Sequence, residues 1–200
     1  MQQEIEAKFL YINHDDMRAR LKRAGAQLEQ PMRVMRRVVI DHEDHRMQGG
    51  DSWIRVRDEG NKVTLTYKTS IEHAFGGATE IEVEVSDYQK TIDIFLACGL
   101  VVTARQETKR ETWKLGESEI VLDEWPWLDP FIEIEAPSEE IVKQTAELLG
   151  QKWEDAVFGS VTTAYRNQYP EITQDQHISA LPEILFDLPV PEWFGKRANR

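Results

Sequence analysis

Residues 4–9 read Glu-Ile-Glu-Ala-Lys-Phe, so polar and apolar side chains alternate along this segment. Successive side chains of a β-strand point to opposite faces of a sheet. Glu4, Glu6 and Lys8 therefore share one face of a predicted strand, and the apolar residues between them share the other. Seven further segments have the same period of two and predict strands: residues 36–41, 52–58, 62–68, 79–85, 110–115, 119–125 and 131–136.

Three segments between these strands have helical signals, with capping residues at the start and glycine at the end. They are residues 15–25, 86–99 and 138–150, and Asp15 or Asp16 is the expected cap of the first. The elements together predict an α+β fold, in which an eight-stranded antiparallel β-barrel (tunnel) has helices packed outside. Residues 1–170 form this domain, and residues 171–200 form a C-terminal tail with one short helix expected within residues 180–188.

The polar faces of the predicted strands carry charges of both signs. If helices cover the apolar faces outside the barrel, the charged faces point into its lumen. The expected cations of the lumen are Lys8, Arg55, Arg57, Lys68 and either Lys109 or Arg110. Its expected carboxylates are Glu4, Glu6, Asp123, Glu133 and Glu135. Uneven alternation leaves open which of Arg33, Arg36 and Arg37 also faces inward.

Like charges crowded in a poorly solvated lumen repel one another unless a ligand lies between them. Arginine suits bidentate contact with phosphate, and lysine contacts phosphate as a point charge. Carboxylate oxygens suit Mg²⁺ or Mn²⁺. The pattern therefore predicts a polyanion together with divalent cations as the occupants of the lumen.

The composition limits the partners. The chain has 200 residues, and 24 Lys and Arg stand against 36 Asp and Glu, which leaves a net charge of −12. This acidic balance argues against a long nucleic acid or an anionic membrane, because both need a basic surface. The chain shows no signal peptide and no membrane-spanning run, and its one cysteine, Cys98, is expected to be a small buried hydrophobe. A cytoplasmic protein is the expectation.

The same segments resemble the CYTH superfamily, also named triphosphate tunnel metalloenzymes. The opening residues match its Glu-x-Glu-x-Lys motif, and WIRVR, VTLTYK, TEIEVEV, TKRETWKLG, IVLDEW and FIEIE follow in the order of that family. The resemblance runs from residue 4 to about residue 168 and implies an antiparallel β tunnel with helices outside. It implies hydrolysis of inorganic tripolyphosphate, thiamine triphosphate or a nucleoside triphosphate with Mg²⁺ or Mn²⁺.

The resemblance also implies roles for single residues. Glu4, Glu6, Asp123, Glu133 and Glu135 match the metal ligands of the family. Lys8, Arg55, Arg57, Lys68 and Arg110, or Lys109 beside it, match the residues that bind the triphosphate. Lys8, Glu6 and Asp123 are the expected catalytic residues, with Asp123 near a second metal that activates water. Glu80, Glu82 and Glu84 match a further acidic strand.

Two other functions remain open from the sequence. Class IV adenylyl cyclases of the same superfamily convert ATP to cyclic AMP and pyrophosphate, and a non-catalytic module would only bind a polyphosphate or nucleotide. Trp125 and Trp127 could stack on a base or a thiamine ring, although packing is the more common role of such tryptophans. A small triphosphate substrate and a homodimer are the expected partners.

Overall fold

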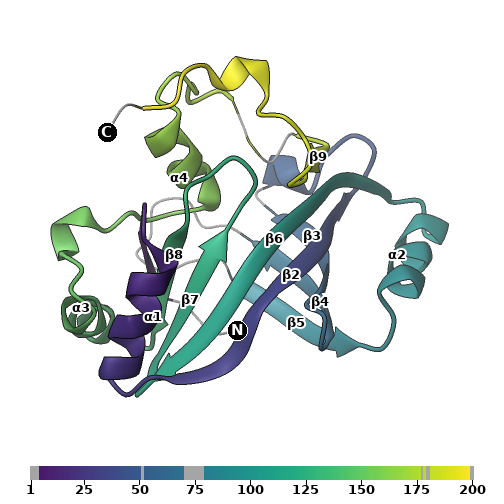
Figure 1. Cartoon of the computed structure of the whole chain (residues 1–200). Helices are drawn as coiled ribbons and strands as arrows, with labels where there is room; N and C mark the ends of the chain where they lie inside the picture. The colour runs from purple at the N-terminus through teal and green to yellow at the C-terminus, as the bar shows by residue number, and fades with distance from the viewer. Residues whose placement is uncertain (1–4, 51, 70–78, 177, 179–180, 199–200) are drawn as a thin grey trace.

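The computed structural model describes residues 5–50, 52–69, 79–176, 178 and 181–198 (Figure 1). The strands of the fold are β1 (Ile5–Phe9), β2 (Gln27–Asp41), β3 (Ser52–Asp58), β4 (Val63–Thr69), β5 (Thr79–Val85), β6 (Val101–Leu115), β7 (Ser118–Glu124), β8 (Phe131–Ala136) and β9 (Glu183–Ile184). The α-helices are α1 (His14–Arg23), α2 (Tyr88–Ala97), α3 (Glu139–Leu148) and α4 (Val161–Gln168). Short 3₁₀ turns occupy Gln48–Gly50, Trp153–Asp155 and Glu192–Phe194.

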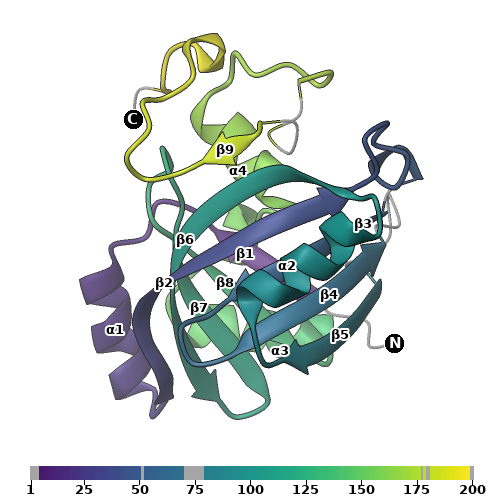
Figure 2. The same ribbon diagram turned by 90° about the vertical axis from the view of Figure 1, so that its right-hand side faces the viewer.

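One antiparallel sheet forms the body of the molecule, with the strand order β1-β8-β7-β6-β2-β3-β4-β5 (Figures 1 and 2). The predicted hairpins β3–β4 and β6–β7 are present. The first strand of the chain pairs with β8, which places Lys8 opposite Glu133. The α+β class and the antiparallel sheet are therefore confirmed. No pairing joins β1 to β5 among the described strands, so closure into a barrel stays a prediction.

Helices α1 and α3 cover the apolar side of β1, β7 and β8. Met17 and Leu21 of α1 and Val142 and Ala146 of α3 are fully buried against this side of the sheet. The strand residues that they meet are Ala7, Phe9, Ile120, Leu122, Ile132 and Ile134, and all of these are buried. Because the apolar faces lie under the helices, the charged faces of the same strands point the other way, as the alternation predicts.

Helix α2 covers the apolar side of β2 and β3, where Ile92 packs against Val38 and Val56. The cover does not extend to β5. Ile81 and Val83 point outward from that strand and are 60% and 51% exposed. The expectation that helices cover every apolar strand face is therefore wrong for β5.

Two local expectations about the helices need correction. Helix α1 is capped by Asn13, whose side chain accepts a hydrogen bond from the backbone N–H of Asp16, so Asp15 and Asp16 lie inside the first turn. Cys98 is exposed, because it caps the C-terminus of α2 beyond the single buried turn of that helix. In the described part of the chain, no helix has the length and apolar character needed to cross a bilayer.

The C-terminal part of the chain packs on the body through helix α4, the two-residue strand β9 and irregular segments between them. Helix α4 was not predicted, and its Tyr165 is fully buried. Within residues 181–188 the expected short helix is absent, and strand β9 instead pairs in parallel with Arg105 and Gln106 of β6. Ile184 and Phe194 enter the same apolar cluster as Tyr165. Figure 2 shows this segment, in yellow, above α4 and β6.

Candidate active site

The inner face of the sheet, defined as the side away from α1, α2 and α3, gathers the charged residues. Lys8 is buried and its ammonium group lies 3.3 Å from Oε1 of Glu133, with Glu6 as a second partner. Arg110 donates to Oε2 of Glu133 over 3.0 Å and to Oδ1 of Asp123 over 2.7 Å. Four strands, β1, β8, β6 and β7, thus contribute to one continuous network of ion pairs.

The two carboxylates of this network have opposite pKa shifts. Burial opposes ionisation of Glu133, but the charges of Lys8 and Arg110 outweigh burial and lower its pKa to about 2. Burial dominates at Asp123, which has no exposed surface, and raises its pKa despite the contact with Arg110. The site therefore offers one carboxylate that stays ionised and one that accepts a proton more readily.

Arginines from three strands crowd the same face. Burial and the neighbouring charge of Arg57 lower the pKa of Arg55 to about 9. Burial, followed by repulsion from Arg55 and Arg57, lowers the pKa of Arg37 well below its ordinary range. Arg110 also contributes to the lowered pKa of both residues. Such crowding disfavours positive charge on these arginines and favours an anion that binds between them.

Most of these cations have a carboxylate partner. Arg57 contacts Glu59 over 2.5 Å, and Arg55 donates to Thr66 over 3.2 Å and to Glu82 over 3.4 Å. On the neighbouring strand, Lys68 is paired with Glu80.

Arg37 differs from the other inner cations. Its guanidinium carbon lies 4.3 Å from the centroid of the Trp125 ring, and no carboxylate of the described residues forms an ion pair with it. The sequence left its direction open. Val38 and Ile40 pack outward under α2, so Arg37, the residue before Val38, points inward, and that parity was a usable signal.

The other two arginines of β2 have clear positions. Arg33 also lies inside and contacts Glu59, whose carboxylate is 3.6 Å away. Arg36 points outward and pairs with Asp58 over 2.9 Å. Glu59 itself, buried at the end of β3, was not selected from the sequence because it lies just beyond the alternating segment.

Of the two alternatives on β6, the structure places Arg110 inside. Lys109 points to the outer side, where its ammonium group lies 3.1 Å from Glu124 and 4.8 Å from the ring centroid of Phe186. The strand has no bulge at this point, so neighbouring residues alternate and Lys109 cannot share the inner face with Arg110.

The acidic residues of β1, β7 and β8 form a row across the sheet. Glu6 stands directly opposite Glu135, and Glu135 stands directly opposite Glu119 on β7. Glu119 was placed on this face by alternation but was not selected, because the register between strands is not visible in a single sequence. Glu4, the remaining expected ligand, lies outside the described residues.

This row fits a divalent cation by its chemistry. Like charges at directly opposite strand positions repel, and carboxylate oxygens are the donors that Mg²⁺ and Mn²⁺ prefer. Within the described ranges, no three acidic, histidine or cysteine side chains converge in the geometry of a metal site. The fit therefore rests on the donor set and on the strand register.

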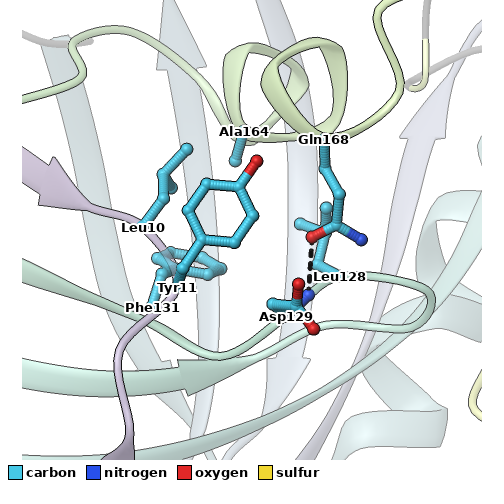
Figure 3. Close-up of a pocket in the computed structure, with 7 residues that line it drawn as sticks. All are labelled: Leu10, Tyr11, Leu128, Asp129, Phe131, Ala164 and Gln168. Atoms are coloured by element: carbon cyan, nitrogen blue, oxygen red, sulfur yellow. Dashed lines mark hydrogen bonds between the residues drawn. The ribbon is translucent and has the colours of Figure 1, made fainter. Parts of the chain in front are cut away.

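Two hollows of the molecule lie away from the inner face. The pocket in Figure 3, between Tyr11, Phe131 and Gln168, has no room for a water molecule. An open cleft of about 510 Å³ beside α1 is lined by His14, Arg18 and Glu124. The charged side chains of the inner face instead contact one another, so a ligand there would replace ion pairs.

A family model that describes a CYTH domain matches residues 2–161. The chain belongs to the CYTH domain family. No curated protein matches this CYTH chain in sequence. The family generally has triphosphatase or adenylyl cyclase activity.

Solved structures similar to this CYTH protein come from several organisms. The PH1012 protein of Pyrococcus horikoshii OT3 is 26% identical with a TM-score of 0.63, over 77% of this chain and 94% of that one. A putative adenylate cyclase of Vibrio parahaemolyticus is 14% identical with a TM-score of 0.71, over 80% and 96%. HpAC1 of Hippeastrum, a putative adenylyl cyclase with a dominant triphosphatase activity, is 14% identical with a TM-score of 0.57, over 84% and 96%. At 14% identity the likeness concerns the fold.

Proposed function

We propose that this CYTH protein is a divalent-metal-dependent hydrolase of a small triphosphate, which binds along the inner face of a sheet that closes into a tunnel. The observation that carries the proposal is the cluster of Arg37, Arg55, Arg57 and Arg110, whose mutual repulsion an anion relieves. A triphosphate chain presents several phosphates in a row, which matches guanidinium groups that come from three neighbouring strands.

The proposed roles follow from the neighbours of each residue. Lys8, Lys68 and the four arginines bind phosphate oxygens and stabilise the charge that develops on them. Asp123 orients a water molecule toward the terminal phosphorus and accepts its proton, since burial raises the pKa of this carboxyl. Mg²⁺ or Mn²⁺, held by Glu4, Glu6, Glu119, Glu133 and Glu135, would supply further neutralisation of the phosphates.

The positions of the two tryptophans favour recognition of the phosphates over recognition of a base. Trp125 is buried with its ring against Arg37, and Trp127 packs edge-on against Phe194 with ring centroids 5.6 Å apart. Both side chains are engaged in packing, so neither is presented to a base or a thiamine ring. Hydrolysis of the triphosphate is therefore preferred to cyclisation of ATP.

The test uses the purified full chain with Mg²⁺ or Mn²⁺. Tripolyphosphate, thiamine triphosphate and ATP are supplied in separate reactions, and the products are separated by ion-exchange chromatography. Orthophosphate release supports the proposal, cyclic AMP with pyrophosphate shows a cyclase, and binding without turnover shows a binding module.

The role of Lys8 gives a second test of the same proposal. We expect Lys8→Gln to lose more than about 99% of phosphate release while the protein stays folded by circular dichroism. Lys152→Gln is the control, because Lys152 is exposed and pairs with exposed Glu154. Full activity in Lys8→Gln would exclude the assignment.

A further inference from the structure

We infer that Trp125 is a positioning residue for Arg37, and that the C-terminal segment, defined as residues 181–198, holds Trp125 in place. The inference rests on the proposed function, in which Arg37 binds a phosphate. It assigns to the C-terminal segment, which lies beyond the region matched by the family model, a role in substrate affinity.

Within the described part of the molecule, the contact that orients the Arg37 side chain comes from the Trp125 ring. The ring lies 4.3 Å from the guanidinium carbon, within the range of a cation–π contact. A guanidinium stacked on a ring keeps the N–H groups of its edge free to form two parallel bonds to a phosphate. Arg55, Arg57 and Arg110 repel Arg37 and Asp123 attracts it, so without the ring no such stacking contact would fix the orientation of its guanidinium.

Helix α4 holds the backbone that follows Trp125. The Tyr165 hydroxyl donates to the carbonyl of Pro126 over 2.8 Å. The Gln168 amide and the Tyr169 hydroxyl both donate to the carbonyl of Trp127, over 2.8 Å and 2.7 Å. Figure 3 shows the other end of this clamp, where Gln168 accepts the backbone N–H of Asp129.

The held loop contains a strained residue. Trp127 has φ +67°, a left-handed conformation that is unfavourable for residues other than glycine. Such a conformation persists only where surrounding contacts fix it, and the hydrogen bonds from α4 do so. Trp125 is therefore attached to a loop of defined shape, not to a free turn.

The C-terminal segment completes the support. The Trp127 indole N–H donates to the carbonyl of Leu188 over 2.7 Å, and Arg197 forms an ion pair of 2.8 Å with Asp129. The fully buried Phe194 ring packs edge-on against Trp127 and Tyr165. Figures 1 and 2 both show this yellow segment lying beside α4, opposite the helices α1 and α3 of the body.

A chain of contacts thus runs from Phe194 through the Trp127 loop to Trp125 and Arg37. If it positions a phosphate-binding group, its loss should weaken substrate binding and leave the chemical step nearly unchanged. A merely structural role would lower the amount of active protein, and would affect variants with and without Arg37 alike.

The experiment is a double-mutant cycle with tripolyphosphate as substrate. We expect Trp125→Leu to raise KM about tenfold with kcat within about twofold, and Arg37→Gln to raise KM by at least as much. Trp125→Leu added to Arg37→Gln should have no further effect. Trp125→Phe, which keeps a ring, should restore most of the affinity. Phe194→Leu should raise KM in the same Arg37-dependent way.

The chain offers a matched control and a second route to the same answer. Trp153 has a similar cation contact, because the ammonium group of Lys143 lies 4.9 Å from its ring centroid. Trp153 lies near α3 on the outer side of the sheet, so Trp153→Leu should leave KM unchanged. If Trp125→Leu fails to fold, Trp127→Phe removes the indole hydrogen bond to Leu188, keeps an aromatic ring beside Phe194, and should raise KM by a smaller factor. If the effects of Trp125→Leu and Arg37→Gln on KM are additive, the inference is wrong. The proposed function still stands in that case, provided that the wild type hydrolyses tripolyphosphate. Absence of both binding and turnover in the wild type would overturn both.

Discussion

Arg110 has the most demanding position of any single residue in the network. Burial alone would lower its pKa, but the charges of Asp123 and Glu133 outweigh burial and raise it. The planar guanidinium group of Arg110 contacts both of these carboxylates, which would otherwise repel each other. Removing a partner from such a buried group leaves uncompensated charge, so single substitutions here should have large effects.

Neighbouring residues on β6 allow a direct comparison of the inner and outer sides. We expect Arg110→Lys to lower kcat/KM for tripolyphosphate by roughly ten- to hundredfold, because lysine cannot bridge Asp123 and Glu133 with one planar group. Lys109→Gln should change kcat/KM for tripolyphosphate by less than about twofold, because Lys109 contacts Glu124 on the outer side. Steady-state kinetics of the two variants checks this. Equal losses would contradict the inward assignment of Arg110.

Glu133 gives a prediction about stability and pH in the absence of metal. Its pKa in the folded protein is about 2, below the ordinary 4.5, so its contribution is complete above about pH 4.5 and is lost as pH falls toward 2. Glu133→Gln should therefore lower the free energy of unfolding at pH 7 by about 3 kcal/mol, and by much less at pH 3. Urea unfolding with a chelator present measures both values. An equal difference at pH 7 and pH 3 would contradict the assignment, and Glu154→Gln serves as the exposed control.

Alternation along single strands was sufficient to place most of the charged residues. It assigned Lys8, Arg55 and Asp123 to one face without knowledge of the sheet, because a period of two needs only local sequence. It left the arginines of β2 undecided, because the alternation there is uneven and the pairing with β6 shifts register on both sides of the segment 33–39. Local sequence does not reveal these irregularities, since they depend on the partner strand.

At the level of elements, the ends of the helices show what local signals establish. The segments predicted to begin at residues 86 and 138 contain the caps of α2 and α3, where Asp87 and Ser138 each accept a backbone N–H from the first turn. At α1 the expected cap was Asp15 or Asp16, but the structure places both in the first turn and the cap at Asn13, which distinguishes the cap from the first turn.

That distinction predicts different effects on stability. Asn13→Ala should lower the free energy of unfolding by about 1 kcal/mol, because it removes the acceptor for the backbone N–H of Asp16. Asp15→Ala should have a much smaller effect, since the Asp15 side chain is 91% exposed and pairs only with Arg18. Urea denaturation of both variants compares them. A larger effect at Asp15 would contradict the capping role of Asn13.

The elements that were missed depend on distant partners. Strand β9 has two residues and exists through its pairing with Arg105 and Gln106, about 80 positions earlier in the chain. Helix α4 is supported by the Trp127 loop and by Phe194, neither of which is adjacent to it in sequence. Propensity within residues 161–200 carries no information about these contacts.

For the whole molecule, the distribution of charge matters more than its sum. The chain has a net charge of −12, while Arg37, Arg55 and Arg57 lie together on the inner face. A net negative charge repels long polyanions, whereas in the proposed function the inner cations attract a short one that reaches the inner face. The sign of the net charge, taken alone, argues against a phosphate ligand, whereas the cations of the inner face favour one.

This separation predicts how binding depends on salt and on ligand length. The Kd for tripolyphosphate, measured by calorimetry with Mg²⁺, should rise at least about tenfold between 50 and 500 mM NaCl, because salt screens the inner cations. Duplex DNA under the low-salt condition should show no binding. Tight binding of DNA would contradict the assignment of the accessible surface as acidic.

Cys98 is the single thiol of the chain and lies exposed at the end of α2, on the side of the sheet opposite the inner face. A maleimide dye will therefore attach at one defined point without any engineered cysteine. Because α2 packs on β3, which carries Arg55 and Arg57, the dye sits behind the strand that we propose contacts the ligand. The native protein thus provides a fluorescent reporter position from which occupancy of the inner face can be followed in real time.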